Sequence, residues 1–138
     1  MRKHEEKIIA LQDEKGKTFV LRDYLLSLQR LFGENVAIEH AAKVPHELIH
    51  RGGRAGMLLF ELHDLKTKVI LKKYLHGSFR SKVLADIHFG SSRAEHEFFL
   101  SLKARGSDIH VPEPICARTV RAGFLGHRDF FLSKYEDN

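Results

Sequence analysis

Apolar and polar residues alternate over short segments along most of this chain, and two longer stretches repeat apolar residues at helical spacing. Residues 8–11 and 18–21 are rich in apolar side chains and flank residues 13–16, whose Asp-Glu-Lys-Gly sequence is typical of a turn. These segments predict a β-hairpin. The leucines that follow predict a helix, with Asp23 as its N-terminal cap and Gly33 as the residue that ends it.

The rest of the pattern predicts strands separated by turns and helices. Segments with the length and composition of strands are residues 48–50, 57–62, 68–74, 115–120 and 130–135. A short helix is expected over residues 78–89 and a longer one over residues 93–105, capped by Ser91 or Ser92. The longer helix carries an apolar stripe of Ala94, Phe98, Phe99 and Leu102. This order indicates an α+β fold, in which a helix packs on an antiparallel sheet of about five strands.

Length and composition restrict the class of protein. The chain has 138 residues, of which 43% are hydrophobic and 30% charged, as in an ordinary globular domain. We expect residues 1–45 to form an N-terminal extension and residues 46–138 the main domain. The single cysteine, Cys116, excludes an internal disulfide and is expected to be buried. No apolar run reaches the length of a membrane span.

The net charge of +5 favours an anionic partner. Nucleotide phosphates, anionic lipid and nucleic acid all have the required charge. No RNA-binding aromatic motif accompanies the basic residues, so nucleic acid is not expected.

One motif predicts a zinc hydrolase. Residues 46–50 read His-Glu-Leu-Ile-His, and H-E-x-x-H binds zinc only when a helix places both histidines on one face. Pro45 precedes the motif, and Gly52 and Gly53 follow it, so about six residues remain for a helix that would be too short to be stable. We therefore expect no metal ligands here.

The same glycines fit a different chemistry. Gly52, Gly53 and Gly56 lie between two predicted strands, where a glycine-rich turn lets backbone N–H groups approach phosphate oxygens. In the protein-kinase pattern G-x-G-x-x-G-x-V, Leu58 takes the position of the valine, above the adenine, although Arg51 replaces the first glycine.

A lysine on the third strand of the series strengthens the phosphate interpretation. Residues 69–72 read Val-Ile-Leu-Lys, which is similar to the V-A-I-K context of the kinase lysine that contacts the α- and β-phosphates. If Lys72 faces inward with Ile70, it needs a carboxylate partner from the following long helix. Glu95 and Glu97 are the two candidates, and helical spacing favours Glu95 because it shares the stripe of the apolar residues.

Together these segments resemble the N-terminal lobe of bacterial lipopolysaccharide core kinases, the Kdo kinase and heptose kinase group, which have a protein-kinase-like fold. The resemblance covers residues 51–135 and rests on Arg51-Gly52-Gly53-Arg54-Ala55-Gly56, Val69-Ile70-Leu71-Lys72-Lys73-Tyr74-Leu75-His76-Gly77, Arg93-Ala94-Glu95-His96-Glu97-Phe98 and Val111-Pro112-Glu113-Pro114-Ile115-Cys116-Ala117-Arg118. An ungapped match to the family places the helix glutamate at Glu97, whereas a two-residue insertion restores Glu95, so both stay open.

The resemblance implies an ATP site, with Mg²⁺ in the complete enzyme. Leu58 and Ile70 would pack on adenine, and backbone groups near Lys134, Tyr135 and Glu136 would bind its edge. The acceptor would be the lipopolysaccharide core or lipid A-Kdo, at the cytoplasmic face of the inner membrane. Kdo kinases often have arginine where this chain has Lys72 and heptose kinases have lysine, so the acceptor sugar stays unassigned.

The catalytic aspartate and the metal ligands of the family belong to a second lobe that has no counterpart before residue 138. We therefore expect a truncated or split kinase, completed by a separately encoded lobe and inactive alone. The alternative is a non-catalytic module, derived from a kinase lobe, that binds a protein or an anionic membrane surface.

Overall fold

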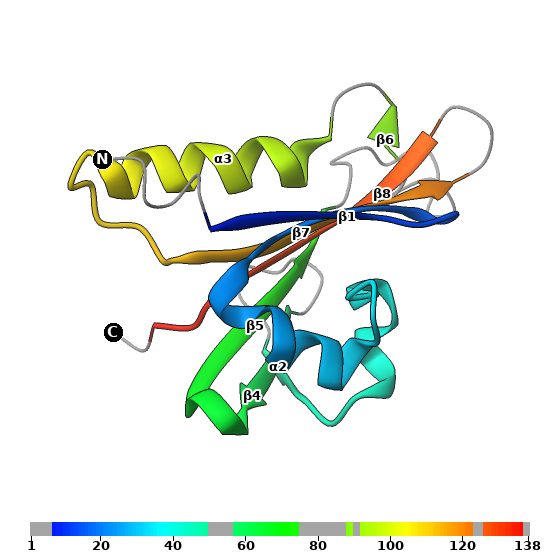
Figure 1. Ribbon diagram of the computed structural model, residues 1–138, viewed down its shortest axis with the longest axis horizontal. Coiled ribbons are helices and arrows are strands. Elements are labelled where there is room, and N and C mark those ends of the chain that lie inside the picture. Colours follow the sequence, from blue (N-terminus) through cyan, green and yellow to red (C-terminus); the bar gives the residue numbers. More distant parts are fainter. Residues whose placement is uncertain (1–6, 50–56, 75–87, 90–91, 123–125, 137–138) are drawn as a thin grey trace.

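The computed structural model describes residues 7–49, 57–74, 88–89, 92–122 and 126–136, which form one antiparallel sheet with helices on both of its faces (Figure 1). The strands are β1 (Ile8–Gln12), β2 (Gly16–Leu21), β3 (Glu47–Ile49), β4 (Met57–Leu62), β5 (Thr67–Lys73), β6 (His88–Phe89), β7 (Pro114–Ala122) and β8 (Gly126–Lys134). The helices are α2 (Arg22–Phe32) and α3 (Arg93–Gly106), and the 3-10 helices are η1 (Ile38–Lys43) and η2 (His63–Leu65).

Seven strands pair in one continuous path, in the order β1-β2-β7-β8-β5-β4-β3, and the short strand β6 pairs with the beginning of β8. The five strands predicted from the sequence are all present, but the prediction of a sheet of about five strands is wrong. The N-terminal hairpin joins the sheet because β2 pairs with β7, where Val20 lies opposite Cys116. This pairing connects segments far apart in the chain, so no local pattern reveals it.

The two faces of the sheet are covered by different helices. Helix α3 lies across β7 and β8 on one face, while α2 and η1 lie against the other (Figure 1). In α3 the buried residues are Ala94, Phe98 and Leu102, spaced four apart as the apolar stripe predicts. Phe99 is 42% exposed, and its ring packs nearly perpendicular to the rings of Phe19 and Phe98.

Helix α2 ends as the sequence predicts but begins differently. Gly33 has a φ of 91°, and its N–H donates to the carbonyl oxygen of Gln29 at 2.9 Å, which ends the helix. The N-cap position is taken by Leu21, with no side-chain cap, so the prediction that Asp23 caps the helix is wrong. Asp23 lies in the first turn instead, where a negative charge interacts favourably with the helix dipole.

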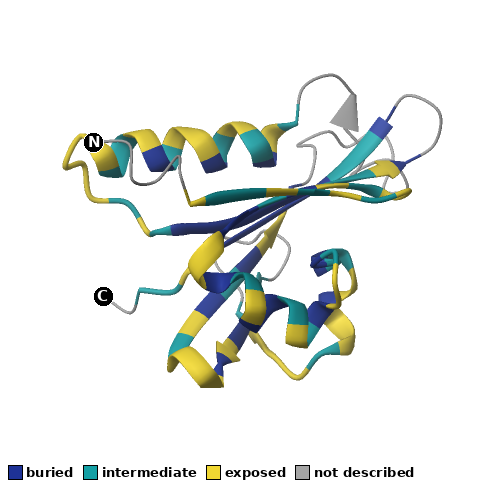
Figure 2. Ribbon diagram, viewed as in Figure 1, coloured by how far each residue is buried: buried dark blue, intermediate teal, exposed yellow. Residues whose placement is uncertain are grey.

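Burial is concentrated in the central strands, as Figure 2 shows. Cys116 on β7 is fully buried, as expected, and burial raises the pKa of its thiol. The expected short helix over residues 78–89 is wrong at its end, where His88–Phe89 form β6; residues 78–87 lie outside the described residues. Within the described ranges, no helix combines the length and the apolar character needed to cross a membrane.

A buried arginine is the charged centre of the face that α2 and η1 cover. Arg118 on β7 donates to both carboxylate oxygens of Glu39, at 2.5 and 3.0 Å, to Asp13 Oδ2 at 3.2 Å and to Thr18 Oγ1 at 2.9 Å. Desolvation alone would lower the pKa of Arg118. The hydrogen bonds to Glu39 and Asp13 and their negative charges outweigh desolvation, so the pKa is raised. Desolvation would likewise raise the pKa of Asp13, but hydrogen bonds and the charge of Arg118 lower it. The cluster joins the hairpin, η1 and β7.

Candidate functional site

Lys72 stands near the end of β5, on the face of the sheet that carries α3. It lies opposite Phe131 of β8, and strand alternation places Ile70 on the same face. Val69 and Leu71 are buried on the other face. The Lys72 side chain is 47% exposed, so it is less enclosed than the sequence argument assumed. A half-exposed ammonium at this position is accessible to an anionic ligand.

The structure brings Lys72 together with Glu97, not with Glu95. The distance from Lys72 Nζ to Glu97 Oε1 is 3.5 Å. Glu95 Oε2 instead accepts a hydrogen bond from Thr119 Oγ1 of β7, at 3.3 Å. Residues two apart on an α-helix differ by about 200° in direction, so the two glutamates cannot face the same strand. The lysine–carboxylate pair that the pattern requires is therefore present, with Glu97 as the acid.

Tyr74 is a third member of this cluster that the sequence argument missed. Its hydroxyl donates to Glu97 Oε1, the same oxygen that faces Lys72. The centroid of its ring lies 4.8 Å from Lys72 Nζ and 5.6 Å from Arg93 Cζ, within the range of cation–π contacts. Its spacing of two residues from Lys72 placed it on the same face of the strand and could have indicated it.

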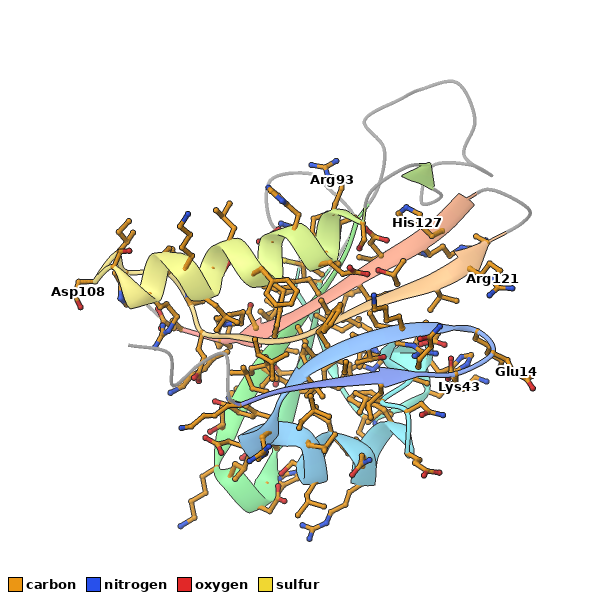
Figure 3. All side chains as sticks on the ribbon, turned by 45° about the horizontal axis from the view of Figure 1, so that its top comes forward. Glu14, Lys43, Arg93, Asp108, Arg121 and His127 are labelled. Atoms are coloured by element: carbon orange, nitrogen blue, oxygen red, sulfur yellow. The ribbon has the colours of Figure 1, made fainter. Side chains whose placement is uncertain are left out.

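Helix α3 is fixed at its N-terminus by a buried aspartate of β8. Asp129 is fully buried, and its Oδ2 accepts from the backbone N–H groups of Arg93, at 2.6 Å, and Ala94, at 3.1 Å. Its Oδ1 lies 2.6 Å from His127 Nδ1. Figure 3 shows Arg93 and His127 at the same end of the molecule. Because Glu97 lies one turn further along, this cap sets where Glu97 meets β5.

Ser92 completes the cap. Its side chain accepts from the backbone N–H of Glu95, at 3.2 Å, as one of the two serines was predicted to do. Its Oγ also lies 2.6 Å from Thr119 Oγ1. Helix α3 is thus tied to both β7 and β8 at its first turn.

The glycine-rich segment has the strand context that the phosphate interpretation requires. Strands β3 and β4 pair antiparallel, with Ile49 opposite Met57, so residues 50–56 connect two neighbouring strands. Gly52, Gly53 and Gly56 lie outside the described residues. The structure gives the zinc motif no helix, because Glu47–Ile49 form β3, and the described part of the chain holds no group of three potential metal ligands.

The expectation that Leu58 and Ile70 share an adenine surface is wrong in this register. Leu58 lies opposite Leu71, on the face covered by α2 and η1, whereas Leu59 lies opposite Ile70. Side chains on neighbouring strands share a face only when they stand opposite each other or two residues apart. Leu59 is therefore the residue of β4 that shares a face with Ile70 and Lys72.

The segment expected to bind the edge of adenine already uses part of its backbone. The N–H of Lys134 donates to the carbonyl oxygen of Glu113, and that of Tyr135 donates to the carbonyl oxygen of Lys68, both at 2.9 Å. The side chain of Glu136 lies 3.0 Å from His110 Nε2. These two N–H groups are therefore not available to bind the edge of adenine.

An open pocket of about 660 Å³ adjoins the cluster, on the side of α3. Tyr74, Arg93 and Glu97 line it, together with Ser92, His96, Leu100, Ser101, Ala104 and Val111. Comparison of the chain with protein-family models, curated proteins and solved structures found no match.

Proposed function

We propose that this chain is the ATP-binding lobe of a kinase related to the lipopolysaccharide core sugar kinases, which phosphorylate Kdo or heptose. The observation that supports the proposal is the approach of Lys72 Nζ to Glu97 Oε1, at 3.5 Å. In protein kinases the third strand supplies a lysine for the α- and β-phosphates, and the following helix supplies the glutamate that pairs with it. Here Lys72 is on the third strand of the β3–β4–β5 series, and Glu97 is on α3.

The chemistry of the pair suits a phosphate ligand. An ammonium group is a compact cation on a flexible stem, which can turn from a carboxylate to a phosphate with little change in position. The separation of 3.5 Å is longer than that of a strong charge-assisted hydrogen bond, and the lysine is half exposed. In the proposed complex Lys72 contacts the α- and β-phosphates, and Glu97 keeps the lysine directed toward them.

The remaining parts of the proposal follow from the resemblance. The fold would be a protein-kinase-like N-lobe, extended by the β1–β2 hairpin and α2. Ile70 and Leu59 would face the base, and Gly52, Gly53 and Gly56 would cover the phosphates. Mg²⁺ would be bound with ATP in the complete enzyme, and a basic chain would suit an anionic glycolipid acceptor at the membrane surface.

Nucleotide binding is the direct test. Calorimetry with Mg-ATP is compared for the wild-type chain, Lys72→Ala and the matched control Lys73→Ala, which removes a lysine from the opposite face of the same strand. A hydrogen bond to a charged group contributes about 1.5–3 kcal/mol, so Lys72→Ala should weaken binding by about tenfold or more. Lys73→Ala should stay within about twofold. Equal affinities for wild type and Lys72→Ala would remove the basis of the proposal.

The acceptor is tested separately. Purified lipopolysaccharide core and labelled ATP are incubated with the chain, alone and co-expressed with a separately encoded candidate for the second lobe. Phosphate transfer that disappears in Lys72→Ala supports the sugar kinase. A non-catalytic anion-binding module predicts a different result. Wild type and Lys72→Ala would then bind acidic vesicles or polyphosphate equally well, and neither would bind ATP selectively.

A further inference from the structure

Three contacts converge on Tyr74, just after β5. Its hydroxyl donates to Glu97 Oε1, and its ring lies against the cationic groups of Lys72 and Arg93. Tyr74 is only 6% exposed, whereas the side chains of Lys72 and Glu97 are 47% and 37% exposed. The tyrosine is therefore the most enclosed residue of the cluster, and the two charged groups are the parts with room to move.

We propose that Tyr74 is a positioning residue that holds Glu97 in place when Lys72 turns from Glu97 to the anionic ligand. This inference rests on the proposed function, because it concerns the same lysine and the same phosphates. It adds a neutral hydrogen-bond donor to the pair of charged residues that the kinase pattern contains.

The physical reason is that one carboxylate oxygen of Glu97 accepts a hydrogen bond from Tyr74 and forms an ion pair with Lys72. Without ligand, Glu97 Oε1 faces both the ammonium of Lys72 and the hydroxyl of Tyr74. When the ammonium engages a phosphate, Glu97 loses part of its stabilisation and could rotate toward solvent. The hydroxyl of Tyr74 still donates to Glu97. The side chain of Glu97 therefore stays in one orientation, because the buried tyrosine holds its hydroxyl in a fixed position. Glu97 then stays close enough to direct the lysine.

The aromatic ring of Tyr74 has a separate role, which is to position Lys72. An ammonium over the face of an aromatic ring is attracted by the ring quadrupole, which does not compete for the carboxylate. The Lys72 Nζ lies 4.8 Å from the centroid of the Tyr74 ring, so the ring restricts the lysine while the hydroxyl restricts the acid. The residue that follows Lys72 by two positions thereby orders both partners.

Substitution of Tyr74 separates these two roles. Tyr74→Phe removes the hydroxyl and keeps the ring, and we expect it to weaken Mg-ATP binding by about three- to tenfold. Tyr74→Leu also removes the ring and should weaken binding further. Tyr24→Phe is the matched control, because the Tyr24 hydroxyl also donates to a glutamate, Glu113, but lies on α2. That control should bind ATP like the wild type.

A double-mutant cycle distinguishes positioning from a general structural effect. In a Glu97→Ala background the hydroxyl of Tyr74 no longer positions the Glu97 carboxylate, so Tyr74→Phe should then change ATP affinity by less than about twofold. An undiminished effect of Tyr74→Phe in that background would overturn the inference. So would a Tyr74→Phe chain that binds ATP as tightly as the wild type.

A ligand-free measurement separates this inference from the proposed function. The wild type, Tyr74→Phe, Glu97→Ala and the double variant are unfolded with urea. The sum of the two single changes in the free energy of unfolding is compared with the change in the double variant. Coupling in stability together with coupling in ATP affinity supports the inference. Coupling in stability without any binding of ATP refutes the proposed function and leaves Tyr74 as a structural anchor of Glu97, which rejects the positioning role.

Discussion

Replacement of Arg118 by methionine tests whether the buried charge cluster holds the N-terminal segments on the sheet. The Arg118 side chain is 1% exposed, and the Glu39 side chain that faces it is 10% exposed. Methionine fills much of the space of the arginine stem but leaves Glu39 buried without its cation, and Asp13, 21% exposed, loses its ion pair with Arg118. The effect therefore measures mainly the cost of leaving the Glu39 carboxylate buried without its cation, because Asp13 keeps the hydrogen bonds from the backbone N–H groups of Lys15 and Gly16.

The expected magnitude follows from burial. Removal of one partner from a buried ion pair costs about 3–5 kcal/mol, whereas a pair exposed to solvent contributes about 0–1 kcal/mol. The chain offers an exposed control in Arg30 and Asp64, which lie 2.8 Å apart with side chains 68% and 38% exposed. Arg118→Met should therefore lower the free energy of unfolding by about 3–5 kcal/mol, and Arg30→Met by about 1 kcal/mol or less.

Urea unfolding followed by far-UV circular dichroism provides the measurement, since the chain has no tryptophan. A typical domain is stable by about 5–15 kcal/mol, so Arg118→Met can approach complete unfolding. Arg118→Lys, which keeps the charge but loses the forked geometry, gives a smaller loss that remains measurable. An Arg118→Met variant as stable as Arg30→Met would refute the argument.

The loss of stability caused by Arg118→Met should also depend on pH. The pKa of Asp13 is lowered in the folded chain: burial opposes this, but hydrogen bonds from the backbone and the charge of Arg118 outweigh it. A lowered pKa contributes stability that is present above the unfolded value of about 3.9 and is lost as the pH falls below it. The difference in stability between wild type and Arg118→Met should therefore narrow below about pH 4.

Two further predictions concern the hairpin and α2. In Gly16→Ala the added Cβ would meet the backbone carbonyl of Thr119 well inside van der Waals contact, so urea unfolding should show a loss of about 1–3 kcal/mol, whereas Gly106→Ala, with open space around it, should be neutral or stabilising. Burial and the hydrogen bond to Glu113 raise the pKa of Tyr24 in the folded chain. The loss of stability caused by Tyr24→Phe should therefore be largest below about pH 10 and become smaller as the pH rises further. Equal stabilities of Gly16→Ala and Gly106→Ala would contradict the first prediction. Ionisation of Tyr24 near pH 10 in the folded chain, followed by absorbance at 295 nm, would contradict the second.

Local patterns were sufficient for part of the candidate site. Strand alternation placed Lys72 and Ile70 on one face, and the lysine context indicated that a helix-borne acid was needed. The choice between Glu95 and Glu97 could not be made, because the apolar stripe describes which side of α3 faces the sheet but not which strand each glutamate meets. Leu58 was placed on the wrong face because the pairing of β4 with β5 fixes the register, and the sequence of β4 alone does not.

The sequence by itself determined most of the elements: the N-terminal hairpin, five of the six strands within residues 47–134, helix α3 with a serine cap at residue 91 or 92, and the end of α2 at Gly33. These depend on hydrophobic period and backbone preference, which act over a few neighbouring residues. Only the tertiary structure decided that the hairpin extends the sheet, that Asp129 of β8 caps α3, and that Tyr74 and Lys72 meet Glu97. Those contacts join residues distant in the chain, and their partners are selected by packing and register.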